Sequence, residues 1–199
     1  MFKFNSGSGN RWLNERDGFE GDILAMVADA SIVYDSVLEL LKSLQSFTKS
    51  VGDDEKKHPY MKASRAARTY AAGMQSSSAS VIKSAERFEK YYSVCCALKE
   101  NIGSTVLAKI ISFREVECKE CDSQMTLLKK TYKDCQNKKN KKNVDTVQLE
   151  AAEASLKKLL EEAKGTLTKF TKAGTEMLTQ LSVDMKAAFD TYSDSGLAC

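Results

Sequence analysis

The residues best suited to chemistry in this sequence are a pair of cysteines and a cluster of lysines. Cys118 and Cys121 form a Cys-x-x-Cys motif, a spacing found at zinc sites and at redox-active turns. A tetrahedral zinc site needs four ligands, and the sequence has no second closely spaced Cys or His pair. The motif also lies within a helical pattern of apolar residues rather than at a strand-to-helix turn. We therefore expect both thiols to serve packing, and we expect no metal and no cofactor.

Other catalytic signatures are absent from the sequence. His58 is the only histidine and stands beside Pro59 in a connection, which excludes His-based triads and paired-His metal sites and favours a solvated loop residue. There is no glycine-rich phosphate loop and no Gly-x-Ser-x-Gly elbow. We expect the protein not to be an enzyme.

The lysine cluster indicates an anionic partner. Residues 56–143 carry nineteen basic against eight acidic side chains, whereas residues 1–55 carry five against ten and residues 144–199 carry six against nine. Such segregation is typical of a surface for anionic membrane headgroups or nucleic acid. No aromatic residues alternate with the lysines, which disfavours nucleic acid. A solubilising loop is the alternative. The candidate membrane-binding residues are Lys129, Lys130, Lys133, Lys138, Lys139, Lys141 and Lys142.

The cluster surrounds a loop, residues 137–143, between two long helical patterns. Apolar residues recur at spacings of three and four from Val81 to Cys135 before the loop, and from Leu149 to Tyr192 after it. A shorter pattern of the same kind runs from Ile23 to Val51. The single proline is consistent with long helices, so the sequence predicts an all-α protein.

Local signals predict where the helices begin and end. Residues 17–20 resemble a capping box for the first helix, and Asn143 or Asp145, with Gln148, is a candidate cap for the last. The second helical segment extends over residues 60–136, roughly 115 Å if continuous at ~1.5 Å per residue, with a weak point at residues 73–78. We expect a flexible segment at residues 1–16, one helical domain at residues 17–192 and a frayed tail at residues 193–199.

Large apolar side chains near the N-terminus have two possible roles. Phe2, Phe4, Trp12 and Leu13 either insert into a bilayer interface or pack on the helical domain. No apolar run has the ~18–20 residues of a membrane-spanning helix, and the first residues do not read as a secretory signal. We therefore expect an intracellular protein with reduced cysteines.

From about residue 17 to 192 the sequence resembles a BAR domain, of the Bin/amphiphysin/Rvs family. The similarity lies in a shorter first helix, two long helices and a basic loop between them, and in stretches such as residues 106–114 and 127–132. The resemblance implies an elongated antiparallel three-helix coiled coil that forms a crescent-shaped homodimer. It implies that the concave face and the basic tips, with the seven lysines, bind curved anionic membranes.

The function that this resemblance implies is membrane binding with curvature sensing or curvature shaping. The expected partners are anionic lipids such as phosphatidylserine and phosphoinositides, and a second copy of the chain. The protein would then be cytoplasmic and peripherally associated with membranes, in trafficking or endocytosis. The alternative is a coiled-coil scaffold or adaptor dimer for protein–protein interaction.

Overall fold

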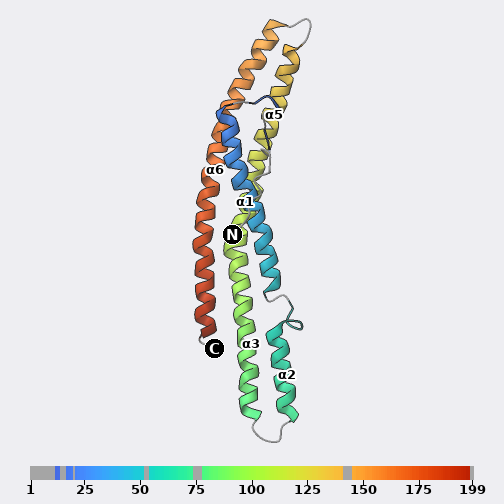
Figure 1. The fold of residues 1–199 in the computed structure, drawn as a ribbon, viewed down its shortest axis with the longest axis vertical. Coiled ribbons are helices and arrows are strands. Elements are labelled where there is room, and N and C mark those ends of the chain that lie inside the picture. The colour runs from blue at the N-terminus through green and yellow to red at the C-terminus, as the bar shows by residue number, and fades with distance from the viewer. Residues whose placement is uncertain are drawn as a thin grey trace. The chain divides into compact units, whose positions relative to one another are not determined.

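The computed structural model describes residues 12–13, 17–19, 21–51, 54–73, 78–140 and 145–197. These residues form helices and connections with no strand (Figure 1), so the all-α prediction is confirmed. Along the chain the structure forms the helical elements α1 (Asp22–Ser50), α2 (Pro59–Gly73), α3 (Ser78–Asn101), η2 (Ile102–Leu107), α4 (Ala108–Phe113), η3 (Arg114–Cys118), α5 (Lys119–Lys139) and α6 (Thr146–Leu197). The described part contains no helix long and apolar enough to cross a membrane.

The helices belong to two compact units. The first unit contains the described residues up to Leu38 together with Ser112–Leu178. The second unit contains Glu39–Ile111 and the described residues from Thr179 onward. The two long helices α1 and α6 therefore contribute residues to both units, whereas α5 lies in the first and α2 and α3 lie in the second.

Helix α1 buries the apolar stripe that its sequence predicts. The spacing of three and four residues places these side chains on one face of the helix, and removing that face from water stabilises it. The buried members of the stripe are Ile23, Val27, Ala30, Tyr34, Val37, Leu41, Leu44 and Thr48. The helical period is thus sufficient to identify the inner face of this element.

Asp17, the predicted N-cap of the first helix, lies five residues before the start of α1. The helix begins at Asp22, because Gly18 and Gly21 hold φ angles of 85° and 68° in the left-handed region that glycine adopts without steric cost. The Asp17 carboxylate instead lies 2.8 Å from the amine of Lys129 on α5. A residue predicted to be a helix cap therefore forms an ion pair with a lysine of the predicted membrane-binding cluster.

The second helical segment is not one continuous helix. Helix α2 ends at Gly73 and α3 begins at Ser78, so the predicted weak point is an interruption. Figure 1 shows α2 beside α3, and the Glu89 carboxylate on α3 joins them. It accepts a hydrogen bond of 2.6 Å from the Ser64 hydroxyl and two of 2.8 Å from the Arg68 guanidinium. The chain reverses direction here, and the predicted helix of about 115 Å does not exist.

Two π-helical turns, η2 and η3, interrupt the α-helical hydrogen bonding between Ser78 and Lys139. A π turn bonds each N–H to the carbonyl five residues back and so adds a residue to the turn. In η3 the buried positions Phe113 and Cys118 are consequently five residues apart. Val116, at the helical spacing of three residues after Phe113, is therefore exposed, and Cys118 and Cys121 are buried.

Helix α6 begins as predicted and ends later than predicted. The backbone N–H of Gln148 donates a hydrogen bond of 3.2 Å to the Asp145 carboxylate, which confirms Asp145 as the N-terminal cap. The helix continues to Leu197, so residues 193–197 are helical rather than a frayed tail. Near its end, the hydroxyl of Tyr192 lies 4.0 Å from the sulfur of Cys95 on α3.

Candidate anion-binding surface on α5

The candidate site is built on a group of aromatic rings in the first unit. Trp12 meets Tyr34 of α1 and Phe170 of α6 edge-on, with ring centroids 5.5 and 6.3 Å apart. The Asp122 carboxylate on α5 accepts a hydrogen bond of 2.6 Å from the Trp12 indole and one of 2.9 Å from the Tyr34 hydroxyl. One carboxylate thus accepts hydrogen bonds from two largely buried side chains. These bonds fix Trp12 against α5.

The burial of Trp12 and Leu13 favours packing over bilayer insertion, the two roles considered for the N-terminal apolar residues. Trp12 is 8% exposed and Leu13 is 0% exposed. In this packing neither side chain is available to a bilayer, so the structure supports packing on the helical domain for these two. These two residues of the segment expected to be flexible, Trp12 and Leu13, therefore belong to the core. Phe2 and Phe4 lie outside the described residues.

A groove of about 570 Å³ lies along α5 beside Trp12. Its α5 side chains form two adjacent rows in which the residues are four apart, so they share one face of the helix. The lining residues are Trp12, Met125, Thr126, Lys129, Lys130, Lys133, Asp134 and Asn137. Three of the seven lysines that the sequence singled out therefore meet at one hollow surface.

Carboxylates neutralise two of the cluster's lysines. Lys129 pairs with Asp17, and the amine of Lys139 lies 2.7 Å from the carboxylate of Glu153 on α6. The hydrogen bond that the Lys139 ammonium donates to Glu153 also raises the pKa of Lys139 above its ordinary value. Neither amine is therefore free to bind an anion without competing with an internal carboxylate.

Three lysines of the cluster are open. Lys130, Lys133 and Lys138 are exposed, and within the part of the chain that the structure describes their amines form no ion pair. Lys138 and Lys139 lie in the last turn of α5, where cations favourably oppose the negative end of the helix dipole. The predicted loop at residues 137–143 therefore begins later, since α5 continues through Lys139. Lys141 and Lys142 lie outside the described residues.

Sequence reasoning missed the neutral and acidic residues of the groove. Met125, Lys129, Lys133 and Asn137 are four residues apart, so their helical spacing could have placed Asn137 beside the lysines. No local signal could have placed Trp12 there, because its partner Asp122 is 110 residues away in the sequence.

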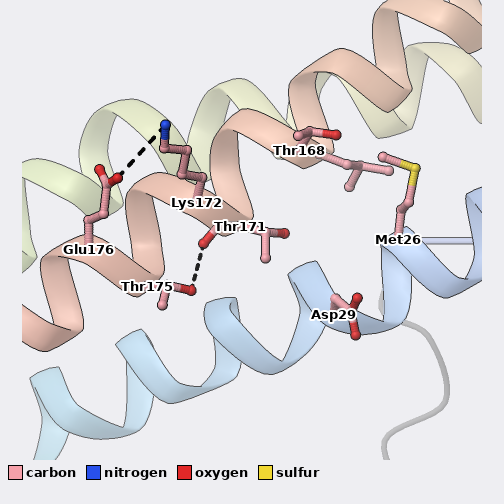
Figure 2. A pocket seen from close by; sticks show the side chains of 8 residues that line it. Met26, Asp29, Thr168, Thr171, Lys172, Thr175 and Glu176 are labelled. Atoms are coloured by element: carbon pink, nitrogen blue, oxygen red, sulfur yellow. Dashed lines mark hydrogen bonds and ion pairs between the residues drawn. The ribbon is translucent and has the colours of Figure 1, made fainter.

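A second groove, of about 510 Å³, lies between α1 and α6 of the first unit. Figure 2 shows Thr168, Thr171 and Thr175 along α6, facing the side of α1 that carries Met26 and Asp29. Its lining includes the ion pair between Lys172 and Glu176, at 4.0 Å, and the Thr175 hydroxyl donates a hydrogen bond of 2.8 Å to the carbonyl of Thr171. The described lining of this groove lacks the cluster of open lysines found on α5.

The cysteines of the Cys-x-x-Cys motif are packing residues, as predicted. Cys118 and Cys121 are both buried, and burial raises the pKa of Cys121 to about 12. A thiol with such a pKa stays protonated at neutral pH and is a poor nucleophile and a poor metal ligand. Among the described residues, no three His, Cys, Asp or Glu side chains gather as a metal site would require.

His58 is half-buried rather than solvated, which corrects the sequence interpretation. Its ring lies 4.9 Å from that of Tyr92 and 5.4 Å from that of Tyr60, measured between centroids. Its Nδ1 accepts a hydrogen bond of 3.3 Å from the backbone N–H of Tyr60. The histidine therefore packs at the start of α2.

No protein-family model matches this chain, and no curated protein sequence shows significant similarity to it.

Proposed function

We propose that this protein binds anionic membrane surfaces through the open lysines of α5, as part of a BAR-like homodimer that senses or shapes curvature. The observation that carries the proposal is the exposure of Lys130, Lys133 and Lys138 within about two and a half turns of one helix, with no carboxylate partner in the described part. Exposed lysine clusters of this kind are attracted to the negative potential of phospholipid headgroups. We propose that the activity is binding rather than catalysis.

The energetics of the open lysines favour a dimer. At about 1 kcal/mol per lysine near an anionic surface, three lysines supply about 3 kcal/mol, which corresponds to binding weaker than about millimolar. Two such surfaces in one dimer would act together and bind far more tightly than either alone. Because screening acts over ~8–10 Å, the binding would weaken steeply with salt.

Exposed apolar side chains of the first unit support self-association. Ile32 is 61% exposed, Val116 is 57% exposed and Leu127 is 48% exposed. A second copy of the chain that covered such residues would remove apolar surface from water. The same exposure also favours the second candidate function, a coiled-coil scaffold or adaptor dimer, in which a partner protein covers them and the lysines serve solubility.

Vesicle co-sedimentation tests the proposal. We expect the K130E/K133E/K138E variant to lose binding to phosphatidylserine vesicles at low salt. The matched control is K42E/K62E/K169E, which changes the net charge equally at three exposed lysines of different helices that form no ion pair in the described part. We expect this control to retain most of the binding.

If the α5 variant and the control variant lose vesicle binding equally, or if the unchanged protein does not bind vesicles, the α5 lysines have no specific role in membrane binding. Sedimentation velocity measures the oligomeric state in the same samples. A dimer that does not bind vesicles would support the scaffold function instead. A monomer at all concentrations would contradict both candidate functions as stated.

A further inference from the structure

We propose that the groove beside Trp12 is a specific site for a phosphorylated polyol, of which an inositol phosphate is the natural example. The inference deepens the proposed function and rests on it, since Lys130 and Lys133 belong both to the groove and to the membrane-binding surface. It adds a defined pocket and a chemical class of ligand to what would otherwise be a diffuse charged surface.

The groove has the size and the mixed lining of a small-molecule site. Its volume of about 570 Å³ lies within the ~300–1,000 Å³ typical of ligand pockets. Trp12 and Met125, both buried, provide an apolar wall. The indole is fixed by its hydrogen bond to Asp122, so this part of the groove is already in place before a ligand arrives.

The polar lining fits a ligand with both phosphate and hydroxyl groups. Lys130 and Lys133 are three residues apart on one face of α5, where two ammonium groups can bind one phosphate. The carboxylate of Asp134 accepts hydrogen bonds from hydroxyl groups and repels phosphate. The amide of Asn137 and the hydroxyl of Thr126 both donate and accept. A polyol ring with one or two phosphates uses all of these groups, whereas bare phosphate uses only the lysines.

The net charge of the site also fits few phosphates rather than many. Asp17 pairs with Lys129, so among the lining residues that the structure describes the two open lysines are opposed only by Asp134. A phosphomonoester carries a charge of about −1.5 to −2 at neutral pH, so one or two such groups match the open lysines. A densely phosphorylated ligand would exceed what the groove can neutralise.

The surroundings of Trp12 disfavour a nucleotide. Base recognition on single strands relies on stacking against an exposed aromatic face. The Trp12 ring is 8% exposed, and Tyr34 and Phe170 pack against it. The groove therefore offers an indole wall but no open face for a base, and a saturated ring is the better fit.

Trp12 is the only tryptophan in the chain, so intrinsic fluorescence reports on this groove directly. We would titrate the full chain with soluble inositol bisphosphate, with inositol and with inorganic phosphate. We expect a saturable fluorescence change with inositol bisphosphate, and affinities weaker by about tenfold or more with inositol and with phosphate. Because each lysine contributes about 1 kcal/mol near an anion, we expect K130Q/K133Q to weaken binding about tenfold or more. Far-UV circular dichroism checks that this variant is folded.

The matched control is K138Q, because Lys138 belongs to the open lysines but does not line the groove. It should retain the response to inositol bisphosphate. Equal weakening in K138Q and K130Q/K133Q would overturn the inference. The absence of a saturable response, or equal affinity for inorganic phosphate and inositol bisphosphate, would also overturn it.

Vesicles distinguish the two sources of the ligand and separate this inference from the proposed function. Tighter binding to vesicles with phosphatidylinositol phosphate than to phosphatidylserine vesicles of equal charge, with loss in K130Q/K133Q, would support a lipid headgroup. A response to soluble inositol bisphosphate without any vesicle binding would support a free inositol phosphate and contradict the membrane function. Binding to phosphatidylserine vesicles with no fluorescence response to any inositol phosphate would overturn the groove site and leave the membrane function standing.

Discussion

The close approach of α1 and α6 at Gly174 makes a sharp prediction about stability. A methyl group at Gly174 would overlap Cγ1 of Val33 and lie 3.3 Å from Cζ of Phe113. Val33 is β-branched and has essentially one side-chain rotamer in a helix, so it cannot move aside. Gly165 lies nine residues earlier in the same helix, about two and a half turns, and a methyl group there would meet nothing within 4 Å. Substitution by alanine should therefore be less favourable for stability at Gly174 than at Gly165.

The expected magnitudes follow from two terms. Replacing glycine by alanine within a helix gains about 1 kcal/mol of stability through helix propensity. Forcing a methyl group into a packed core costs about 1–3 kcal/mol. Gly165→Ala should thus stabilise the protein by up to about 1 kcal/mol. Gly174→Ala should be less stable than Gly165→Ala by about 1–3 kcal/mol, because the propensity term cancels in that comparison.

Urea unfolding followed by far-UV circular dichroism measures this difference. We expect the loss in Gly174→Ala to be smaller in a Val33→Ala background, since truncating Val33 removes the overlapping carbon. A double-mutant cycle isolates this coupling from the cost of truncating Val33. If Gly174→Ala is as stable as Gly165→Ala, the packing of α6 against Val33 described above is wrong.

Three further predictions concern the groups that fix the helices and the thiols. Asp122→Ala removes the acceptor of the hydrogen bonds from Trp12 and Tyr34, so it should lower the free energy of unfolding in urea by about 2–3 kcal/mol. It should also change the tryptophan fluorescence emission, and unchanged emission would contradict the hydrogen bond from the indole to Asp122. Hydrogen bonds from Arg68 and Ser64 hold the pKa of Glu89 down to about 2, below its ordinary 4.5. The stability that the ionised Glu89 carboxylate contributes is therefore full above pH 4.5 and is lost as the pH falls toward 2. Glu89→Gln should flatten this acid dependence, and an identical pH profile would refute the assignment. Buried Cys121, with a pKa of about 12, should resist alkylation at neutral pH, whereas half-buried Cys96 should react. Peptide mass spectrometry measures both, and equal labelling of the two thiols in the folded protein would contradict the burial of Cys121.

The helical period in the sequence was enough to predict the fold class and much of the buried surface. Spacings of three and four residues identified the inner face of α1 without any knowledge of its neighbours. The Asp145 cap was also predictable, because a capping bond joins residues only three apart in the chain. These features depend on backbone geometry over one or two turns.

Local sequence patterns were less informative about the interruption after Gly73 and about the buried positions around Cys118. The glycine and serines of residues 73–78 indicated a weak point in the helix, but only the contacts of Glu89 with α2 show that the chain folds back there. The π turn at residues 114–118 adds one residue to the spacing, and a regular helical pattern cannot anticipate it.

The candidate site depended most on distant contacts. The sequence identified a run of lysines as one charged group, whereas carboxylates on other segments divide it: Asp17 pairs with Lys129 and Glu153 pairs with Lys139. The position of Trp12 likewise depends on an acceptor 110 residues away. Residue type and spacing set the helices and their inner faces, because those follow from local backbone geometry. Which lysines stay open, and which ring lines the groove beside them, follows from side chains that meet only when the helices pack.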